Sequence, residues 1–278
     1  MSTGDVQLKR VAFLGPTGTH SEAAAAAYAP ESILVAAPSI TAVTEMVLSG
    51  GADEAIVPIE NSLEGSVTET LDLLVHSLNL QIRHEYVLPI HHCLIARPGT
   101  SFDAIETIYS HPQAIGQCRG FLQRTIPNAR REASLSTAQS VELGLQNENS
   151  AGIAPRRAAE INSAVILADG IQDDDRNSTR FVVLSDDDAD PTGDDKTSIA
   201  FNVDDKPGAL LTIMQQFAMA EINLLKIESR PARETLGVYI FLLDCIGHRS
   251  DEKLAKVLNT VREKTVWLKV FGSYPRYS

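Results

Sequence analysis

The ten residues DDDADPTGDD (186–195) divide this sequence into two parts with different patterns. They contain six aspartates and no basic residue, so they supply half of the formal net charge of −12. An acidic run with proline and glycine, and with no apolar residue larger than alanine, cannot fill a core, which indicates a linker. We therefore expect one domain over 1–186, an acidic linker over 187–196 and a second domain over 197–278.

The part after this segment shows six patterns, in the order strand, helix, strand, strand, helix, strand. They are KTSIAFNVD (196–204), PGALLTIMQQFAMA (207–220), INLLKIESRP (222–231), LGVYIFLLDC (236–245), DEKLAKVLNTVREK (251–264) and VWLKVFGSYP (266–275). This order predicts the split βαβ, or ferredoxin-like, unit. A four-stranded sheet with helices on one face leaves edges that pair readily with a second copy, so we expect a dimer.

The part before the segment alternates between short apolar runs and helical patterns. Strands are expected at 10–15, 54–62, 86–96, 105–110, 129–134, 150–154, 164–169 and 179–185, and helices at 20–29, 40–50, 65–76, 112–124 and 137–147. Such alternation predicts a mostly parallel α/β fold. In that fold, ligands bind beyond the carboxyl ends of the strands.

The composition narrows the class of protein. Of the 278 residues, 44% are hydrophobic, which is enough to fill a core, and no run of apolar residues is long enough to span a membrane. The acidic charge argues against a nucleic-acid partner. The first ten residues contain no apolar export signal, and Cys93, Cys118 and Cys245 lie too far apart for a disulfide framework. These features predict a cytoplasmic protein without membrane contact.

Three polar segments fall where a strand gives way to a helix or where a strand begins. They are GPTGTHS (15–21), PIENSLEGSVTETLDLL (58–74) and NSTRF (177–181). Taken singly, each is typical of an ordinary feature: a βα loop, a set of helix caps and a turn. In the third segment, Arg180 is a forked cation of the kind that holds a carboxylate with two hydrogen bonds.

Other polar side chains point to no further chemistry. His91 and His92 are adjacent, so on a strand they face opposite sides and cannot both bind one metal ion. Cys118 lies on the apolar side of a helical pattern and is interpreted as a core residue. The remaining histidines lack the spacing of a zinc site. We expect no metal and no cofactor.

Taken together and in order, eight segments resemble the prephenate dehydratase family with its C-terminal ACT regulatory domain. They are GPTGTHSE, PIENSLEGSVTETLDLL, HPQAIGQC, AGIAP, NSTRF, KPGALL, INLLKIESRP and YIFLLD. The resemblance covers residues 9–275. It implies an α/β fold with a two-lobed catalytic domain like a type II periplasmic binding protein, followed by a ferredoxin-like βαββαβ ACT domain. It also implies decarboxylating dehydration of prephenate to phenylpyruvate in phenylalanine biosynthesis.

The resemblance also implies roles for individual residues. Thr179 matches the family's essential threonine, and Asn61 and Ser62 match residues of the same cleft, which makes these three the catalytic candidates. The candidates for substrate binding are Arg180, Phe181, Thr17, Ser39 and Glu64. His20 stands where the family usually has an aromatic residue. We expect helix N-termini and Arg180 to hold the two carboxylates of prephenate, and Thr179 to assist departure of the C4 hydroxyl.

In the second domain, the resemblance implies a binding site for phenylalanine as an allosteric effector. Its candidate residues are Gly208, Ala209, Leu210, Leu211, Asn223, Leu224, Glu228, Ser229, Arg230 and Pro231. Three questions stay open at this point. The substrate is prephenate or its aminated form arogenate, the chain is an enzyme or a non-catalytic sensor module, and the oligomer is a homodimer or a homotetramer.

Overall fold

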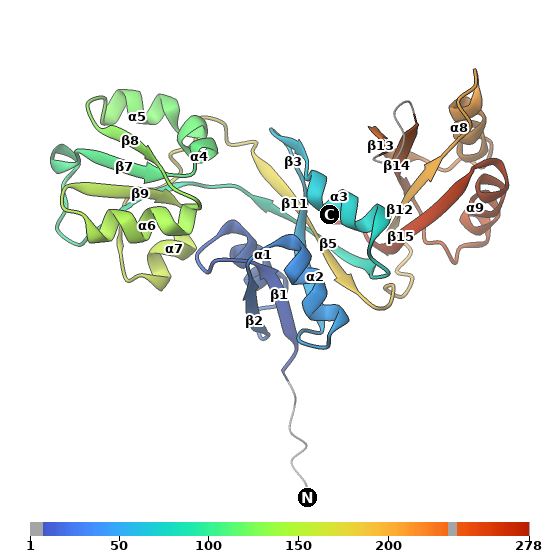
Figure 1. The fold of residues 1–278 in the computed structure, drawn as a ribbon, viewed down its shortest axis with the longest axis horizontal. Coiled ribbons are helices and arrows are strands. Elements are labelled where there is room, and N and C mark those ends of the chain that lie inside the picture. Colours follow the sequence, from blue (N-terminus) through green and yellow to red (C-terminus); the bar gives the residue numbers. More distant parts are fainter. Residues whose placement is uncertain (1–7, 233–237, 278) are drawn as a thin grey trace, which may run out of the picture. The chain divides into compact units, whose positions relative to one another are not determined.

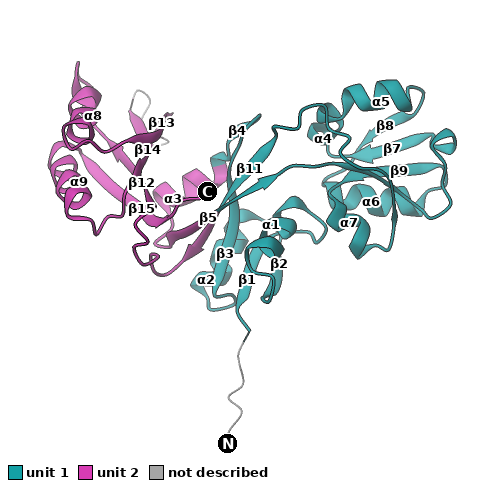
Figure 2. Cartoon of the chain, turned by 180° about the vertical axis from the view of Figure 1, so that it is seen from behind, with its two compact units in different colours: residues 1–68, 86–181 teal, residues 69–85, 182–278 magenta. Residues whose placement is uncertain are grey.

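The computed structural model describes residues 8–232 and 238–277. Within these ranges the chain forms two compact units (Figure 2). Unit 1 contains the residues up to 68 together with 86–181, and unit 2 contains 69–85 together with the residues from 182 onward. The acidic segment therefore belongs to unit 2, and so does a stretch from the first third of the chain.

The first sheet of unit 1 has the strand order β2-β1-β3-β11-β5, with β4 paired to β3. Its elements are β1 (Arg10–Leu14), α1 (His20–Tyr28), β2 (Ile33–Ala37), α2 (Ile40–Leu48), β3 (Glu54–Asn61), β4 (Gly65–Ser66), β5 (Gln81–Pro89) and β11 (Ser178–Ser185). Strand β1 is parallel to both β2 and β3. Strands β5 and β11 each continue from unit 1 into unit 2.

The second sheet of unit 1 has the order β10-β6-β9-β7-β8 (Figure 1). Its elements are β6 (Cys93–Ala96), η1 (Phe102–Ala104), β7 (Thr107–Ser110), α4 (Pro112–Gln117), α5 (Arg119–Thr125), β8 (Arg130–Ala133), α6 (Thr137–Gln146), β9 (Ser150–Ala154), α7 (Arg156–Ile161) and β10 (Val165–Ala168). Helix α6 lies very close to β9, because a Cβ atom at Gly152 would sit 2.5 Å from the Ser140 carbonyl oxygen. This contact fixes the position of α6.

The α/β class and the two-lobed arrangement are confirmed, with one sheet in each lobe. The prediction of mostly parallel strands is wrong for the second sheet. Strand β6 is antiparallel to both β9 and β10, whereas β7 is parallel to β8 and β9. Consecutive apolar strands predict burial on both faces, but they carry no information on strand direction.

Three predicted boundaries differ from the structure. The helix expected from Gly65 begins at Thr68, as α3 (Thr68–His76), because Gly65 and Ser66 pair with the end of β3. The strand expected over 86–96, with an interruption at Pro89, begins earlier, at Gln81, and is divided after Pro89 into β5 and β6, where the Ile90 N–H donates to the Asn177 carbonyl. The helix expected over 112–124 breaks at Cys118 into α4 and α5.

Unit 2 contains the ferredoxin-like unit that the sequence predicts. Its elements are β12 (Asp195–Asn202), α8 (Ala209–Met219), β13 (Leu224–Pro231), β14 (Tyr239–Ile246), α9 (Glu252–Lys264) and β15 (Trp267–Pro275). The strand order is β13-β14-β12-β15, and all neighbours are antiparallel. Both helices lie on one side of this sheet (Figure 1). The first residues of the strand predicted over 236–245 lie outside the described residues.

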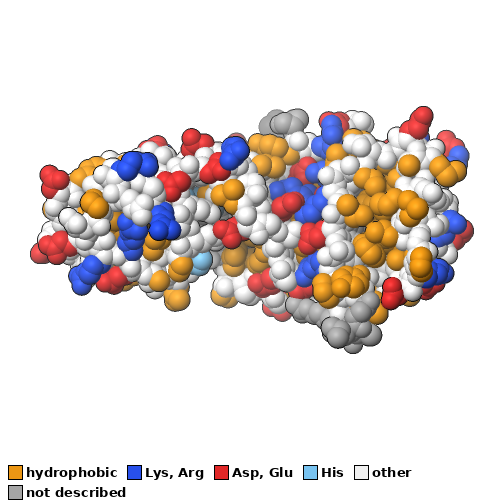
Figure 3. All heavy atoms as spheres, turned by 90° about the horizontal axis from the view of Figure 1, so that it is seen from above, with side chains coloured by type: hydrophobic (Ala, Val, Ile, Leu, Met, Phe, Trp, Pro, Cys, Tyr) orange, Lys and Arg blue, Asp and Glu red, His pale blue; other side chains and the backbone are white. Residues whose placement is uncertain are grey.

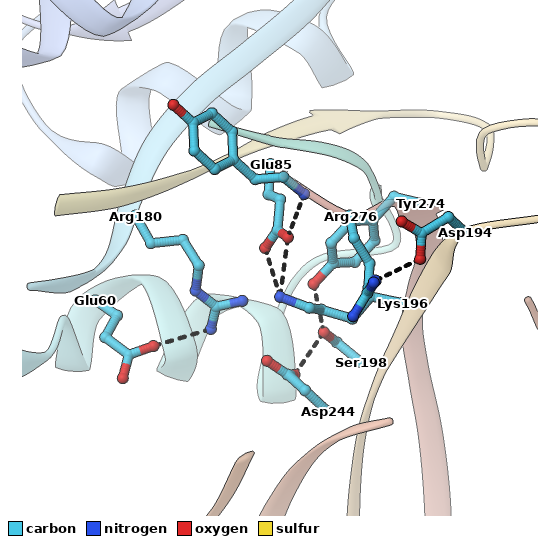
Figure 4. A network of polar contacts seen from close by, with 10 residues as sticks. Glu60, Glu85, Arg180, Asp194, Lys196, Ser198, Asp244, Tyr274 and Arg276 are labelled. Atoms are coloured by element: carbon cyan, nitrogen blue, oxygen red, sulfur yellow. Dashed lines mark hydrogen bonds and ion pairs between the residues drawn. The ribbon is translucent and has the colours of Figure 1, made fainter. Parts of the chain in front are cut away.

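Helix α3 and the start of β5 are built into unit 2. The Lys269 ammonium on β15 donates to the carbonyl oxygens of Val75 (3.3 Å), in the last turn of α3, and of Leu78 (2.7 Å), just after the helix. Near the start of β5, Lys196 binds the buried Glu85 carboxylate at 2.8 Å (Figure 4). A cation at a helix C-terminus complements the helix dipole, and a buried carboxylate needs a partner, so both lysines hold this stretch in unit 2.

The acidic segment, which its composition predicts to be a linker, makes ordered contacts through two of its aspartates. Asp195 is 3% exposed and accepts hydrogen bonds from Thr192 and from the Gly193 N–H. Asp188 pairs with Arg249 and accepts from a backbone N–H of β15. These aspartates therefore stabilise the turn into β12, a tertiary role that composition cannot indicate.

The cysteines and helices agree with the expectations from composition. All three cysteines are buried and free, and burial raises the pKa of each thiol to about 12. In the part of the chain that the structure describes, no helix combines the length and apolar character that a membrane span requires.

Candidate active site

Unit 1 contains a cavity of about 340 Å³. Its walls come from the end of β3, the start of β11 and the N-termini of three helices, α1, α4 and α6. The cavity lies where strands end and helices begin, which is the usual position of a ligand site in an α/β fold.

Asn61 and Thr179 meet in this cavity although they are far apart in sequence. The Asn61 Nδ2 amide donates to Thr179 Oγ1 at 2.9 Å, and also to Asn177 Oδ1 at 2.8 Å. Its Oδ1 atom accepts from the backbone N–H groups of Leu63 and Glu64. The turn after β3 therefore fixes the orientation of the Asn61 amide, and Asn61 in turn fixes the Thr179 hydroxyl.

Two helix N-termini give the cavity a positive electrostatic character. Thr19 caps α1 by accepting from the Glu22 N–H, and Ser136 caps α6 by accepting from the Gln139 N–H. The unpaired N–H groups and the dipoles of such termini favour anions. Among the described residues that line the cavity there is no Asp, Glu, Lys or Arg. The site can therefore attract an anion through the helix N-termini, without a charged side chain in the described lining.

An ion pair between the buried Glu22 and the partly exposed Arg157 holds the turn that precedes α1. The Glu22 carboxylate is 4% exposed, accepts from the Gly18 N–H at 2.5 Å and pairs with Arg157 at 3.1 Å. Gly18 has a φ of 83°, a left-handed conformation that glycine adopts without strain. The GPTGTHS turn is thus fixed by charge and backbone geometry, which places Thr19 at the cavity wall.

Two histidines form part of the wall, the buried His92 and the half-buried His20. Their rings lie edge to face, with centroids 5.3 Å apart and an interplanar angle of 80°. Burial, reinforced by the charges of His92 and His91, lowers the pKa of His20 to about 3. Burial also lowers the pKa of His92, although its hydrogen bond to Gln117 acts in the opposite direction. Both imidazoles are therefore neutral at neutral pH.

The structure brings three of the residues predicted from the sequence to the cavity: Asn61, Thr179 and Phe181. Phe181 is 2% exposed and adds an apolar wall. Arg180, the neighbour of both Thr179 and Phe181, is not among the described residues that line the cavity. Its guanidinium pairs with Glu60 at 3.1 Å (Figure 4).

The other four predicted residues lie outside the described lining of the cavity. Ser62 is exposed and exchanges hydrogen bonds with the backbone of Arg176 and Ser178. Glu64 and Thr17 are exposed, and Ser39 caps α2 through the Ala42 N–H. Ser62 thus joins the turn after β3 to the segment before β11.

Sequence reasoning did not identify several residues of the lining. The most important are His92, Gln117, Ser136 and Asn177. Gln117 lies in the quoted segment HPQAIGQC, and Asn177 begins NSTRF, so both motifs contained the signal. His92 was considered only as a metal ligand, and in the described part of the chain no cluster of three or more histidine, cysteine or acidic side chains suits a metal ion.

The candidate effector residues lie in unit 2, around the start of α8 and along β13. Ala209 and Leu210 line a cavity of about 170 Å³. Gly208 is the α8 N-cap, with a φ of 83°. Arg230 pairs with Asp72 of α3 at 2.8 Å, and Glu228 pairs with Lys226 at 3.3 Å. The remaining candidates are Leu211, Asn223, Leu224, Ser229 and Pro231, of which only Leu224 packs against the core.

Several large apolar side chains of unit 2 are exposed. Leu211 is 60% exposed, Tyr239 50%, Ile227 49% and Leu225 41%. Hydrophobic side chains also gather at the right-hand end of Figure 3. An exposed apolar area of this kind commonly marks an interaction surface.

Comparison with known proteins gives concordant matches over both parts of the chain. Residues 11–189 match the family model described as prephenate dehydratase, and residues 197–263 match the ACT domain model. The bifunctional chorismate mutase/prephenate dehydratase of Stutzerimonas stutzeri is 40% identical over 270 residues, which is 96% of this chain and 73% of that protein.

Solved structures resemble the chain over almost its whole length. The crystal structure of prephenate dehydratase from Arthrobacter aurescens in complex with L-Phe has a TM-score of 0.88 and 37% identity, and the match covers 96% of this chain and 90% of that one. A structure described as GqqA, a novel type of quorum quenching acylase, has a TM-score of 0.87 and 28% identity, and covers 97% and 98%.

Proposed function

This chain belongs to the prephenate dehydratase family, and we propose that it converts prephenate to phenylpyruvate, carbon dioxide and water on the route to phenylalanine. One observation carries the proposal. The hydroxyl of Thr179, oriented by Asn61, lies in a cavity whose wall includes two capped helix N-termini and, among its described residues, no acidic side chain.

The cavity suits a dianionic substrate. Prephenate carries two carboxylates, and the N-termini of α1 and α6 offer N–H groups and positive dipole ends to such groups. Because these donors are fixed before the substrate arrives, they do not have to reorganise during the reaction. We assign the binding of the carboxylates to these termini. Arg180 is paired with Glu60, so we assign it a structural role: its ion pair joins the start of β11 to the end of β3.

Thr179 is assigned to the departing hydroxyl. Its Oγ1 already accepts a hydrogen bond from Asn61, so its own O–H is available to donate. Breaking the C1–carboxylate bond releases carbon dioxide and moves an electron pair into the ring. The C4–O electron pair leaves with oxygen, and one proton converts hydroxide to water. A hydrogen bond from Thr179 stabilises the charge that develops on that oxygen.

An acylase activity, the kind named for the GqqA structure, is less well supported. A serine or threonine nucleophile needs a base within hydrogen-bond reach, most often an imidazole. In the described part of the cavity, the His92 ring is hydrogen-bonded to the Gln117 side-chain oxygen, and His111 Nδ1 accepts from the Gln113 backbone N–H. A non-catalytic sensor would bind prephenate and leave it unchanged.

The test is turnover of prephenate and arogenate side by side, with an N-acyl substrate as a third arm. We expect phenylpyruvate from prephenate and a fall in kcat of about 100-fold in T179V, since removing one such donor costs about that much. T125V is the matched control, because Thr125 is exposed on α5 and outside the described lining. Near-normal turnover by T179V would refute the role of Thr179.

Regulation by phenylalanine is proposed for unit 2. The support is the ACT family match together with the L-Phe complex of the Arthrobacter aurescens relative. We place the effector at the start of α8 and the ESRP residues of β13. An effector shifts activity only if it binds one arrangement of the chain more tightly than the other. Turnover and sedimentation that both stay unchanged in saturating phenylalanine would contradict this assignment.

We further propose that the chain forms a homodimer or homotetramer and acts in the cytoplasm. The exposed apolar side chains of α8, β13 and β14 support a surface that takes a second copy. Sedimentation at several concentrations separates dimer from tetramer, and cell fractionation tests the location. A monomer at all concentrations would exclude the assembly.

A further inference from the structure

Leu135, just before α6, differs in exposure from other apolar residues that line the cavity. Its side chain is 87% exposed, whereas Ile90 and Phe181 are 5% and 2% exposed. A leucine that lines the cavity and also faces solvent lies at the rim, where a bound molecule meets water. Single exposed leucines are common on protein surfaces, so the surroundings of Leu135 decide whether it has a role.

Hydrogen bonds on both sides fix the backbone at Leu135. The Ser134 N–H donates to the Ser110 carbonyl at 2.9 Å, and the Ser134 hydroxyl donates to the Ser136 carbonyl at 2.8 Å. The Leu135 N–H donates to Gln139 Oε1 at 2.7 Å, while the Gln139 N–H donates to the Ser136 hydroxyl at 3.0 Å. The exposed side chain is therefore carried on a backbone that is tied to β7 and to the first turn of α6.

The common structural role of an apolar residue in this position does not apply to Leu135. It directly precedes Ser136, the N-cap of α6, and a side chain there often packs against the fourth helical residue in a hydrophobic staple. In α6 that residue is Ser140, which is 0% exposed. Its hydroxyl lies 2.6 Å from the Thr137 carbonyl oxygen and 2.9 Å from that of Ile153. Because this position holds a hydrogen-bonded polar group, α6 supplies no staple partner to Leu135.

The position of Leu135 matches the substrate of the proposed function. Ser136 and Thr137, the N-cap and first residue of α6, also line the cavity, and this terminus is assigned to one carboxylate of prephenate. Because Leu135 is the adjacent residue, a carboxylate at this terminus brings the carbon framework attached to it next to the leucine side chain. In prephenate that framework includes a six-membered hydrocarbon ring, and contact with it removes apolar surface of both partners from water.

Resting on the proposed function, we infer that Leu135 is a specificity-determining residue that covers the ring of the bound substrate. It selects an acid whose carboxylate is attached to an apolar framework. In the free chain its side chain is solvated, and in the complex it lies between the ring and water. The same contact excludes water from the start of α6, which strengthens the interaction of the N–H groups there with the carboxylate.

Three substitutions of Leu135 test this assignment. L135A removes the cover, L135N keeps a side chain of similar size but makes it polar, and L135M keeps an apolar side chain of similar volume. We expect KM for prephenate to rise about 10-fold in L135A and L135N, with kcat changed less than about twofold, and L135M to stay within about threefold of the wild type. L48A is the matched control, because Leu48 is an exposed leucine of α2 outside the described lining.

Folding and association are measured on the same proteins. An exposed side chain contributes little to stability, so we expect the urea midpoints of all three variants to equal that of the wild type. An unchanged KM in L135A and L135N overturns the assignment. A change in sedimentation without a change in KM also overturns it, because that result places Leu135 at a contact between copies of the chain.

Calorimetric binding of phenylpyruvate separates this assignment from the proposed function. Phenylpyruvate carries a ring and a carboxylate and is not consumed, so its Kd does not depend on turnover. We expect that Kd to rise about 10-fold in L135A. Turnover of prephenate by the wild type, with KM and Kd unchanged in L135A, overturns this assignment alone. A wild-type chain that leaves prephenate unchanged overturns the proposed function; a raised Kd in L135A then still supports an apolar cover for ring-bearing acids, whereas an unchanged Kd overturns both.

Discussion

Acidification should destabilise unit 1 through His20, whose environment opposes protonation. Burial, followed by the charges of His92 and His91, lowers the pKa of His20 to about 3. In the unfolded chain, the pKa of a histidine is about 6.5. Between these two values the unfolded state binds more protons, so stability falls as the pH falls from 6.5 towards 3.

The size of the effect follows from this difference in pKa. At pH 5, an unfolded His20 is almost fully protonated and the folded one is neutral, which costs about 2 kcal/mol relative to pH 7.5. This is an upper figure, because the cavity side of the ring is partly open to water while Nε2 is buried. About 2 kcal/mol is a large fraction of the stability of a typical domain.

The assay is urea unfolding of the wild type and H20F, followed by circular dichroism at pH 7.5 and pH 5. Phenylalanine keeps a ring in the cavity wall and removes the titrating group, and the carboxylates titrate alike in both proteins. We expect the wild type to lose about 2 kcal/mol more than H20F on acidification. Equal losses in the two proteins, or a His20 NMR titration centred near 6.5, would refute the reasoning.

Four substitutions in unit 2, arranged in three experiments, test the contacts that hold it together. G272A should lower the free energy of unfolding by about 3 kcal/mol, since the new Cβ atom would lie 2.1 Å from a carbonyl oxygen of β5. A urea midpoint equal to that of the wild type would contradict this close contact. K196M removes the ammonium that pairs with the Glu85 carboxylate, which is 2% exposed, and should lower the free energy of unfolding by about 3–5 kcal/mol in the same measurement. A loss below about 1 kcal/mol would mean that water solvates the carboxylate in the variant. A double-mutant cycle of R230A and D72A should give a coupling of about 1–2 kcal/mol, whereas additive losses would show that the pair contributes no interaction.

Local sequence patterns correctly predicted the helices and strands whose positions depend on neighbouring residues alone. Ser39 caps α2 through its own side chain, and the order of strand and helix patterns predicted the α/β class of the first domain and the ferredoxin-like unit of the second. Errors occurred where distant segments decide the geometry. The late start of α3, for example, depends on the pairing of Gly65 with Asn61 at the end of β3.

The candidate site shows the same difference between what local sequence determines and what contacts between distant segments determine. Thr179 and Asn61 were identified through their motifs, but their 2.9 Å hydrogen bond joins positions 118 residues apart and is a property of the fold. His92 was set aside because sequence reasoning asked only whether it could bind a metal. Its position in the cavity wall depends on contacts through Gln117, and no pattern in the neighbouring residues encodes those contacts.

The incorporation of residues 69–85 into unit 2 has a consequence for truncation. A cut at the acidic segment follows the family boundary between residues 189 and 197, yet it divides a compact unit. The shortened chain would keep α3 and the start of β5 but lose Lys269, which binds the carbonyls after α3, and Lys196, which neutralises Glu85. Deletion of the ACT region therefore yields a fragment in which α3 loses its contact with Lys269 and the Glu85 carboxylate loses its ion pair with Lys196. In such a fragment, a loss of the response to phenylalanine could not be distinguished from a loss of folding. Variants that no longer respond to phenylalanine are therefore better made by point substitution.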